Sequence, residues 1–415
     1  METTKPFKIS KQDVERAWEL VRANNGTYGV DGETIEQFES ARAGHLYKLW
    51  NRLSSGSYFP PAVKTVVIPK KTGGERRLGI PTVADRVAQT VAKLHFEPRV
   101  EPYFHTDAYG YRPTKSAHQA LEVTRRRCWR HHWVLEFDIK GLFDNIAHEL
   151  LMKAVRQHTA NRWLLLYIER WLTAPIQRED GTTVSRKRGV PQGGVLSPVL
   201  SNLFMHYAFD QWMERHFPDK PFCRYADDGL VHCQSEADAQ AIQNALAKRL
   251  QVYGLELHPE KTKIVYCKDE DRVGKYPVTS FDFLGYTFRP RRSKNRWGKF
   301  FINFSPAMRD KAGKPMRQEV RRWKLHLRSD KSLLDLAQMF RAKIQGWINY
   351  SGRFYKSAMY STLRQINRKL CLWAKRKYKK LRHHSRRAEH RLGEMAVKHP
   401  NLFPHWKLGV RPMVG

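Results

Sequence analysis

The fold is decided by the stretch Phe222-Cys223-Arg224-Tyr225-Ala226-Asp227-Asp228-Gly229-Leu230-Val231-His232-Cys233. Two adjacent acids, Asp227 and Asp228, lie between two short runs of apolar and β-favouring residues. The pattern predicts a β-hairpin whose turn carries both acids, with Gly229 easing the reversal. Adjacent carboxylates on a rigid turn repel each other, so they favour a hard cation such as Mg²⁺, which prefers oxygen ligands. For an isolated Asp-Asp pair, an ordinary acidic turn is the alternative.

Charge is the strongest global feature of the chain. The 415 residues include 75 Lys and Arg against 40 Asp and Glu, a formal net charge of +35. Residues 286–415 hold 34 of these cations and 6 of the acids, so they carry +28 of the total. Such an excess opposes compaction unless a polyanion relieves it, which makes nucleic acid the expected partner. The first part is expected to be an enzyme body and the second a nucleic-acid-binding region.

The cysteines and the hydropathy pattern indicate a compartment. The five cysteines form no C-x-x-C pair, which argues against a zinc ribbon or a disulfide framework. No apolar run approaches the length of a membrane span, and the N-terminus lacks the apolar segment of a signal peptide. We therefore expect no membrane association and a location in the cytoplasm.

Periodicity and turn residues predict a mixture of helices and strands. Helices are expected over residues 13–22, 34–53, 82–96, 163–172, 198–215 and 237–253, with a further one starting near residue 148. Strands are expected over residues 65–68, 77–80, 133–139, 264–267 and 281–286. Beyond Arg289 the pattern predicts basic helices, whose apolar faces carry Leu333, Leu336, Phe340, Ile344 and Trp347, then Met359, Leu363, Ile366, Leu370 and Trp373.

A third acid, Asp138, ends the predicted strand 133–139. Nucleotidyl transfer uses two divalent cations about 3.5–4 Å apart, and carboxylates from two separate strands can hold such a pair. We expect Asp138 to converge with Asp227 and Asp228. Taken alone, Asp138 would more simply be a helix cap or a surface acid.

The residues around these acids resemble a known family. Tyr225-Ala226-Asp227-Asp228 is similar to the catalytic box of reverse transcriptases, and residues 137–144 and 189–198 are similar to their preceding motifs. Further similarities lie at residues 29–32, 76–81, 283–286 and 346–350. Together these motifs resemble the reverse transcriptase/maturase encoded by bacterial group II introns.

The resemblance implies an α+β, right-hand polymerase fold with fingers and an antiparallel palm, followed by an all-helical thumb and maturase domain X. The implied bounds are residues 1–104 for the fingers, 105–288 for the palm with the remaining finger elements, and 289–415 for the thumb and domain X. The implied activity is RNA-directed DNA synthesis that copies intron RNA into cDNA, with assistance to splicing and intron mobility. The paired Cys or His ligands of an HNH endonuclease are absent, so no endonuclease domain is expected and the primer would come from another source.

The resemblance also implies residue roles. Asp138, Asp227 and Asp228 would be catalytic and would hold two Mg²⁺ ions with the carbonyl of Ile139; Mn²⁺ is an alternative ion. The implied nucleotide contacts are Lys70, Arg76, Phe143, Gln192 and Lys261. Lys70 and Arg76 would hold the triphosphate, Phe143 would exclude a 2′-hydroxyl, and Lys261 would serve the leaving pyrophosphate. Core packing for Phe143, a backbone-bonded amide for Gln192 and a surface role for Lys261 remain open.

The implied primer grip is Phe283, Leu284, Gly285 and Tyr286, for which simple core packing is the alternative. The basic surface expected on the helix over residues 359–380 would bind RNA through Arg376, Lys377, Lys379 and Lys380. The implied partners are group II intron RNA, an RNA template with a DNA primer, dNTPs and target DNA, with a homodimer left open. A splicing-only maturase and a domesticated reverse transcriptase with a host role, such as phage defence, are the alternatives.

Overall fold

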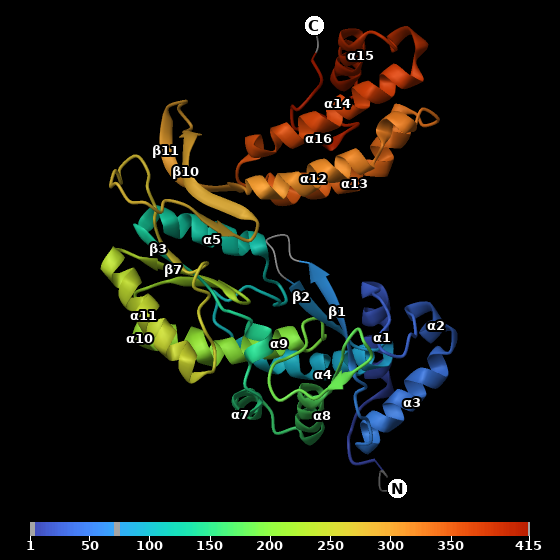
Figure 1. Cartoon of the computed structure of the whole chain (residues 1–415), viewed down its shortest axis with the longest axis vertical. Helices are drawn as coiled ribbons and strands as arrows, with labels where there is room; N and C mark the ends of the chain where they lie inside the picture. Colours follow the sequence, from blue (N-terminus) through green and yellow to red (C-terminus); the bar gives the residue numbers. More distant parts are fainter. Residues whose placement is uncertain (1–4, 70–74, 414–415) are drawn as a thin grey trace. The chain divides into compact units, whose positions relative to one another are not determined.

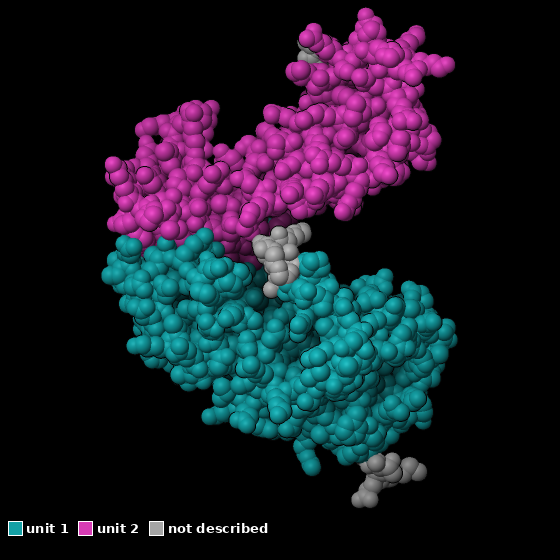
Figure 2. Space-filling model, in the orientation of Figure 1, with its two compact units in different colours: residues 1–120, 135–264 teal, residues 121–134, 265–415 magenta. Residues whose placement is uncertain are grey.

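The computed structural model of the chain describes residues 5–69 and 75–413 (Figure 1). The described chain forms two compact units, shown in separate colours in Figure 2. Unit 1 comprises residues 1–120 and 135–264, and unit 2 comprises residues 121–134 and 265–415. The predicted bounds of fingers, palm and thumb are a different division of the chain and stay a prediction.

Unit 1 begins with helices that, except for the third, are capped at their N-termini by a hydroxyl side chain. These helices are α1 (Lys11–Asn24), α2 (Ile35–Ser40), α3 (Arg42–Ser55) and α4 (Val83–Val100). Ser10, Thr34 and Thr82 each accept a hydrogen bond from a backbone N–H three residues further on, which satisfies a donor that the helix leaves open. The prediction of a single helix over residues 34–53 is wrong, because the helix is interrupted at Ala41, between α2 and α3.

A basic hairpin follows, as the sequence predicts. Strands β1 (Val63–Pro69) and β2 (Glu75–Ile80) pair antiparallel, and β1 also pairs in parallel with the short strand β4 (Ile176–Gln177). With β5 (Thr183–Val184) they form a four-stranded sheet in the order β2-β1-β4-β5. The residues that join β1 to β2 include Lys70, which lies outside the described residues.

A second four-stranded sheet carries the acids. Its order is β6-β7-β3-β8, from strands β6 (Phe222–Tyr225), β7 (Asp228–Cys233), β3 (Trp133–Asp138) and β8 (Lys263–Tyr266). The following helices complete this part of the chain: α5 (Ala117–Arg130), α6 (Leu142–Asn145), α7 (His148–His158), α8 (Arg162–Thr173), α9 (Ser197–Met205), α10 (Gln211–His216) and α11 (Glu236–Val252). Between α9 and α10 the chain widens into a π-helical turn over His206–Asp210, so the helix expected over residues 198–215 is continuous but irregular. Because β7 lies next to β3, Asp228 and Asp138 are on neighbouring strands.

In the segment 265–415 of unit 2, strands extend past Arg289 into a region where helices were expected. The predicted strand over residues 281–286 is wrong: β9 (Phe281–Phe283) ends at a turn, and β10 (Tyr286–Lys294) runs back beside it. Strand β11 (Phe300–Met308) then pairs with β10, so the basic segment after Arg289 is a long hairpin before it becomes helical. Alternating Arg and Lys with polar residues fits a two-sided strand as well as a basic helix, which explains the error.

The helical part of unit 2 has one apolar core. Its helices are α12 (Asp310–Arg322), α13 (Leu333–Ser351), α14 (Tyr360–Lys377), α15 (Ser385–Lys398) and α16 (Pro404–Lys407). Leu336 and Ile344 of α13 and the predicted stripe of α14, from Leu363 to Trp373, are buried together. The indole of Trp323 stacks on Phe340, with ring centroids 4.2 Å apart. No helix in the described part of the chain is long and apolar enough to cross a membrane.

A buried histidine ties the C-terminal segment to this core. His405 is fully buried, and its Nε2 lies 2.8 Å from Oδ1 of Asn367, which also accepts a hydrogen bond from the Trp406 indole. The Asn367 amide in turn donates to the carbonyl of Val410. Burial lowers the pKa of His405 to about 3, so the ring stays neutral in the folded protein.

This histidine predicts a loss of stability in acid. Below its ordinary pKa of 6.5 the unfolded chain gains a proton that the folded chain cannot take up, so stability falls as pH falls from 6.5 towards 3. The loss attributable to His405 is about 1.4 kcal/mol for each pH unit within this window. Chemical unfolding at a series of pH values, compared between wild type and His405→Gln, measures it. Parallel pH profiles for the two proteins would contradict the assignment.

Candidate active site

The predicted acidic hairpin is present, with its turn one residue earlier than expected. Tyr225 pairs with Asp228 across β6 and β7, so the turn consists of Ala226 and Asp227. Ala226 adopts a positive φ of 58°, an uncommon conformation for a residue with a Cβ. Asp228 is therefore the first residue of β7 rather than part of the turn. The surrounding structure must hold this strained turn in place.

Gly229 has a different role from the one predicted. It lies within β7, and a Cβ at this position would come within 2.1 Å of the Phe137 ring. Gly229 thus makes room for the aromatic side chain that precedes Asp138 on the neighbouring strand. Gly110 allows a similar approach from the other side, because a Cβ there would lie 2.5 Å from the backbone nitrogen of Ala226. Two glycines let neighbouring segments pack closely around the turn.

The three acids come together as the sequence predicts. Burial, followed by the negative charges of Asp227 and Asp138, raises the pKa of Asp228 to about 7. A hydrogen bond between the carboxyl groups of Asp228 and Asp138 contributes to this shift. Burial also raises the pKa of Asp227, with a further contribution from the charge of Asp138. Like charges brought together in a poorly solvated place favour either a shared proton or a bound cation.

Lys261 supplies part of the positive charge. Its Nζ lies 2.6 Å from Oδ2 of Asp138, and its own side chain is 57% exposed. Backbone hydrogen bonds from His258 to Asp138 and from Lys140 to Glu256 hold this segment against the end of β3. These two hydrogen bonds lie on either side of Ile139, and neither uses the Ile139 carbonyl oxygen. This is compatible with the predicted role of that oxygen as a metal ligand. Lys261 therefore lies beside Asp138, and its predicted role toward the pyrophosphate stays a prediction.

The donor chemistry suits a hard divalent cation. The three side chains offer carboxylate oxygens, and the raised pKa values of Asp227 and Asp228 report a concentration of negative charge. Across residues 5–69 and 75–413, however, no three His, Cys, Asp or Glu side chains form a ready-made metal cluster. The ammonium of Lys261 contributes one positive charge beside Asp138. Mg²⁺ binding by these acids therefore stays a prediction.

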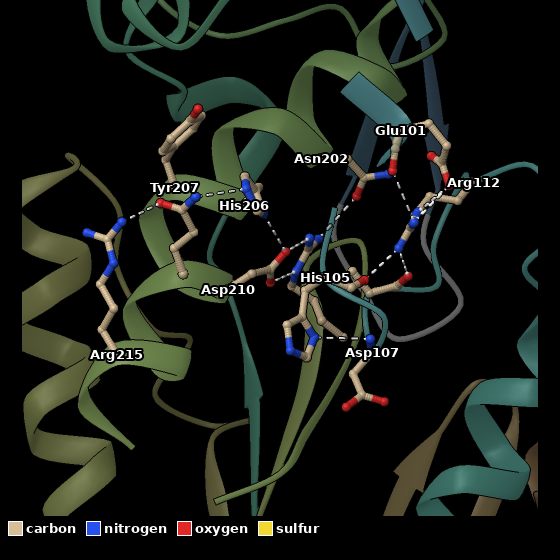
Figure 3. A network of polar contacts seen from close by, with 12 residues as sticks. Glu101, His105, Asp107, Arg112, Asn202, His206, Tyr207, Asp210 and Arg215 are labelled. Carbon is tan, nitrogen blue, oxygen red and sulfur yellow. Dashed lines mark hydrogen bonds and ion pairs between the residues drawn. The ribbon is translucent and has the colours of Figure 1, made fainter. Parts of the chain in front are cut away.

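A buried ion pair contacts the turn, and its acid, Asp210, is labelled in Figure 3. Both carboxylate oxygens of Asp210 accept hydrogen bonds from the Arg224 guanidinium, at 2.7 Å and 2.6 Å. The remaining nitrogen of Arg224 donates to Asn202 Oδ1 at 3.1 Å and to the carbonyl of Ala226 at 3.2 Å. Arg224, Asp210 and Asn202 are each 1% exposed or less. A buried charge therefore fixes the carbonyl of the strained turn residue.

A second arginine, Arg112, fixes the segment over residues 105–108 (Figure 3). Arg112 donates to the backbone carbonyls of His105 and Ala108, at 2.6 Å and 2.7 Å, and forms an ion pair with Glu101. Asn202 connects the two arginines. Its side-chain oxygen accepts from Arg224, and its amide nitrogen donates to the carbonyl of Gly110, two residues before Arg112. Neither Arg112 nor Arg224 stood out in the sequence, since only their contacts distinguish them from surface arginines.

The predicted nucleotide contacts Arg76 and Gln192 meet each other. Nε of Arg76 donates to Oε1 of Gln192 at 3.0 Å, and the backbone N–H of Gly79 donates to the carbonyl of Gln192. Strand β2 thus packs on the glycine-rich loop over residues 189–194. A Cβ at Gly193 would lie 2.5 Å from the Gly79 carbonyl oxygen, so this approach requires glycine. The amide oxygen of Gln192 thus accepts from the exposed Arg76 side chain rather than from the backbone, unlike the stated alternative, and the nucleotide contacts of both residues stay predictions.

A buried carboxylate anchors the other end of this loop. Oε1 of Gln89 accepts hydrogen bonds from the backbone nitrogens of Val195 and Leu196, and its amide nitrogen donates to Asp85. Asp85 is fully buried and also accepts from Tyr58 and Trp171. Asp85 and Gln89 both lie on α4, so their hydrogen bonds fix the end of the loop that carries Gln192 relative to this helix.

Phe143 and Tyr111 complete the described surroundings. Phe143 is 8% exposed, so most of its ring is packed in the interior, and its carbonyl accepts a hydrogen bond from Val190. Tyr111, which the sequence analysis missed, has a φ of 57°, and its ring lies 6.4 Å from that of Tyr225. Burial and the nearby Asp227 charge raise the pKa of Tyr111. Only the backbone conformation distinguishes this tyrosine, and no sequence pattern reports it.

The predicted primer-grip residues form the β9–β10 turn in unit 2. Leu284 and Gly285 both have positive φ, at 49° and 81°. The hydroxyl of Tyr350 donates to the carbonyl of Leu284, and the buried Tyr286 donates to the carbonyl of Tyr350. The turn is therefore joined to the end of α13 by two reciprocal tyrosine contacts. Core packing, the stated alternative, holds for Phe283 and Tyr286, whereas Gly285 is exposed.

The predicted RNA-binding residues are not equivalent. Helix α14 ends at Lys377, and Lys379 and Lys380 lie in a short 3₁₀ turn. Arg376, Lys379 and Lys380 are exposed, as expected. Lys377 instead donates to the backbone carbonyls of Ser329 and Lys331, at 2.8 Å and 2.9 Å. The expectation that all four cations face solvent is therefore wrong for Lys377, whose charge stabilises a loop.

Comparisons with known proteins agree with this geometry. Residues 68–288 match the family described as reverse transcriptase (RNA-dependent DNA polymerase). The chain is 32% identical to Protein YkfC of Escherichia coli over 318 residues, which cover 66% of this chain and 79% of that protein. The chain belongs to the reverse transcriptase family.

The second half of the chain adds a more specific match. Residues 314–392 match the maturase-specific domain of group II introns. The group II intron-encoded protein LtrA of Lactococcus lactis is 33% identical over 193 residues, 46% of this chain and 32% of that protein. The chain thus spans about a third of LtrA. A structure of telomerase from Candida albicans with a telomeric RNA fragment aligns with a TM-score of 0.47 at 14% identity, over 88% of this chain and 69% of that one.

The buried ion pair yields a prediction that separates stability from positioning. Arg224→Met or Asp210→Leu alone leaves one buried charge unpaired, which is expected to cost about 3–5 kcal/mol of stability. The double variant removes both charges and is expected to recover most of that stability. It still lacks the donor to Ala226, so primer extension should remain reduced by about 10²-fold, as for a displacement of about 1 Å. Thermal melting and extension assays on the same preparations test this, and full extension activity in a stable double variant would show that the pair serves stability alone.

Proposed function

We propose that this chain is an RNA-directed DNA polymerase that copies group II intron RNA into cDNA and binds that RNA to assist splicing and mobility. The observation that carries the proposal is the convergence of Asp138, Asp227 and Asp228, with the pKa of Asp228 raised to about 7, in a chain that also matches the maturase domain. A splicing-only maturase would not need this cluster of acids. A domesticated host role is not favoured by any described contact.

In this proposal the three acids and the Ile139 carbonyl hold two Mg²⁺ ions, for which Mn²⁺ is a substitute. When bound, the ions activate the primer 3′-hydroxyl and stabilise the charge of the triphosphate. Arg76 offers its guanidinium to the triphosphate from β2, where Gln192 fixes its orientation. Lys261, beside Asp138, is placed to donate a proton or a charge to the leaving pyrophosphate. Phe143 limits the space beside the sugar, and Lys70 has the same proposed role as Arg76.

The finer assignments of partners and architecture also belong to this proposal. The sheet that carries the acids would be the palm, and the helices after Met308 the thumb and domain X. The β9–β10 turn would grip the primer. The partners would be intron RNA, a template–primer duplex, dNTPs and target DNA, in a bacterial cytoplasm and near the nucleoid when DNA is bound. A homodimer stays open.

Loss of one acid should stop DNA synthesis and leave RNA binding intact. Asp227→Asn removes a charge from the cluster where several kcal/mol of transition-state stabilisation would reside, so extension on RNA templates with Mg²⁺ should fall by more than about 10³-fold. Asp219→Asn is the matched control, because Asp219 is a 72% exposed acid in the loop before β6. Extension and intron-RNA binding are measured for both variants. Near wild-type extension by Asp227→Asn would remove this residue from the site.

Removal of exposed cations should have the opposite effect. Arg376→Gln, Lys379→Gln and Lys380→Gln together leave the α14 core and the Lys377 contacts intact, so the protein should fold. Each lost phosphate contact is expected to lower the salt slope of intron-RNA binding by about one or slightly less. Splicing should be impaired, with short-primer extension only moderately reduced.

The control for this variant neutralises three exposed cations of unit 1, Lys48, Lys153 and Arg156, by the same change to Gln. Filter binding across a salt series compares the two triple variants. An unchanged affinity and slope in the α14 variant, or an equal loss in the control, would mean that this surface does not specifically hold the intron.

A further inference from the structure

The hairpin of β10 and β11 has a rigid, basic tip. The strands are nine residues each and stay in register from Tyr286–Met308 to Lys294–Phe300. The Asn295 side chain accepts hydrogen bonds from the backbone nitrogens of Trp297 and Lys299, at 3.0 Å and 2.9 Å, which fixes the loop. Between residues 286 and 308 the sequence has six Lys and Arg and no Asp or Glu. A rigid projection with this charge is suited to a polyanion.

One face of the hairpin is packed against the rest of unit 2. The indole of Trp129 donates to Asn303 Oδ1 at 2.8 Å and to the carbonyl of Phe304 at 3.0 Å. On the same face the guanidinium of Arg291 donates to the Ser305 carbonyl, and burial lowers its pKa. These groups are occupied by internal contacts. On the opposite face the residues near Tyr286 and Met308 are buried as well, so only its tip half, from Arg292 and Ile302 outward, is open to a partner.

The opposite face, which we call the outer face, combines aromatic and cationic side chains. It carries Arg292 and Lys294 of β10, paired in register with Ile302 and Phe300 of β11. Phe300 is 52% exposed and Ile302 is 48% exposed. The Arg292 guanidinium carbon lies 3.9 Å from the centroid of the Phe300 ring. An apolar ring with a cation above it is thus presented to solvent.

The tip repeats this arrangement. Trp297 is 75% exposed, and the guanidinium carbon of Arg296 lies 4.1 Å from the centroid of its ring. An exposed indole at the end of a rigid loop gains nothing from the core of unit 2. Together, Trp297 and Phe300 provide two aromatic surfaces on one hairpin, each accompanied by an arginine.

A hollow lies at the edge of the hairpin beside this face. Its volume is about 400 Å³, and its lining combines Pro290, Arg292, Phe300 and Ile302 of the outer face with Arg291 and Phe301 of the other face and with Glu270. Glu270 is the one acid among the lining residues, and its backbone N–H donates to the Ile302 carbonyl. A carboxylate at this point disfavours a phosphate in the hollow, whereas Arg292 and the tip cations favour phosphates beside it. The chemistry therefore suits a base in the hollow and a backbone along the cations.

We propose that the outer face and tip of this hairpin bind single-stranded RNA, with bases stacked on Phe300 and Trp297 and phosphates held by Arg292, Lys294, Arg296 and Lys299. Stacking needs base faces that a duplex conceals, so unpaired RNA is the fitting partner. The excess of positive charge disfavours a typical protein partner. The choice of RNA rests on the proposed function, but the binding itself requires no polymerase activity.

The test measures equilibrium binding of the full-length protein without dNTPs. The probes are a fluorescein-labelled single-stranded RNA of mixed sequence and the same strand with abasic residues. Trp297→Ala with Phe300→Ala should weaken binding of the base-bearing strand by about tenfold or more, the size expected for a lost base stack. Binding of the abasic strand and the salt slope should stay unchanged. Changing Arg292, Lys294, Arg296 and Lys299 to Gln should instead lower the salt slope, by about 0.7 for each lost contact with a single strand.

Tyr47→Ala is the matched aromatic control, since Tyr47 of α3 is 59% exposed with Lys11 5.4 Å from its ring. Equal weakening in this control, or equal weakening for the abasic strand, would overturn the proposal. So would a wild-type dimer that the hairpin variant dissociates in sedimentation, because the face would then be a contact between copies. Asp227→Asn binds both probes like wild type if the hairpin acts independently of catalysis. If the protein extends primers but its hairpin variants bind the RNA probe like wild type, this inference is wrong and the proposed function still holds.

Discussion

The catalytic turn depends on an ion pair that solvent does not reach. Asp210 and Arg224 meet through two short hydrogen bonds, and a third arm of the guanidinium holds the carbonyl of Ala226. Burial of two charges is costly, and the pair offsets that cost only because every nitrogen and oxygen has a partner. The pair also positions the turn, because the Arg224 guanidinium donates to the carbonyl of Ala226, whose φ of 58° is unfavourable by itself. Asp227, the next residue, inherits its position from this contact.

The same rigidity keeps the acids together despite their repulsion. Asp138 and Asp228 lie on neighbouring strands of a sheet whose interior strands are buried, so neither can swing away to reduce the interaction. The consequence is the raised pKa of Asp228 and the contact between Lys261 and Asp138. A flexible loop would relax by separating the charges. A fixed sheet retains the negative potential until a cation enters, and this retention is the property that a polymerase site requires.

The sequence was sufficient for the acids and insufficient for what holds them. Asp138, Asp227 and Asp228 could be predicted because strand ends and tight hairpins leave local signals. Arg224 stands beside Tyr225 in the same motif, yet nothing local distinguishes a buried arginine from an exposed one. Gly229 was assigned to the turn because glycine commonly occurs there, whereas its actual partner, Phe137, is far away in sequence. The hairpin after Arg289 was missed because its alternating cations satisfy a helical pattern too. Lys377 was misjudged because its carbonyl partners belong to another loop.

The two units manage positive charge in opposite ways. In unit 1, Arg112 and Arg224 are buried and saturated by carboxylates and carbonyls, so they build the scaffold and contribute little to the surrounding field. In unit 2, most cations lie on surfaces, and residues 286–415 have only 6 acids to balance 34 Lys and Arg. Surface cations without acids repel one another, and this repulsion is relieved when a polyanion binds and releases its counterions. Internal pairing thus stabilises the buried arginines of unit 1, whereas the charge of unit 2 is of the kind that a bound polyanion would offset.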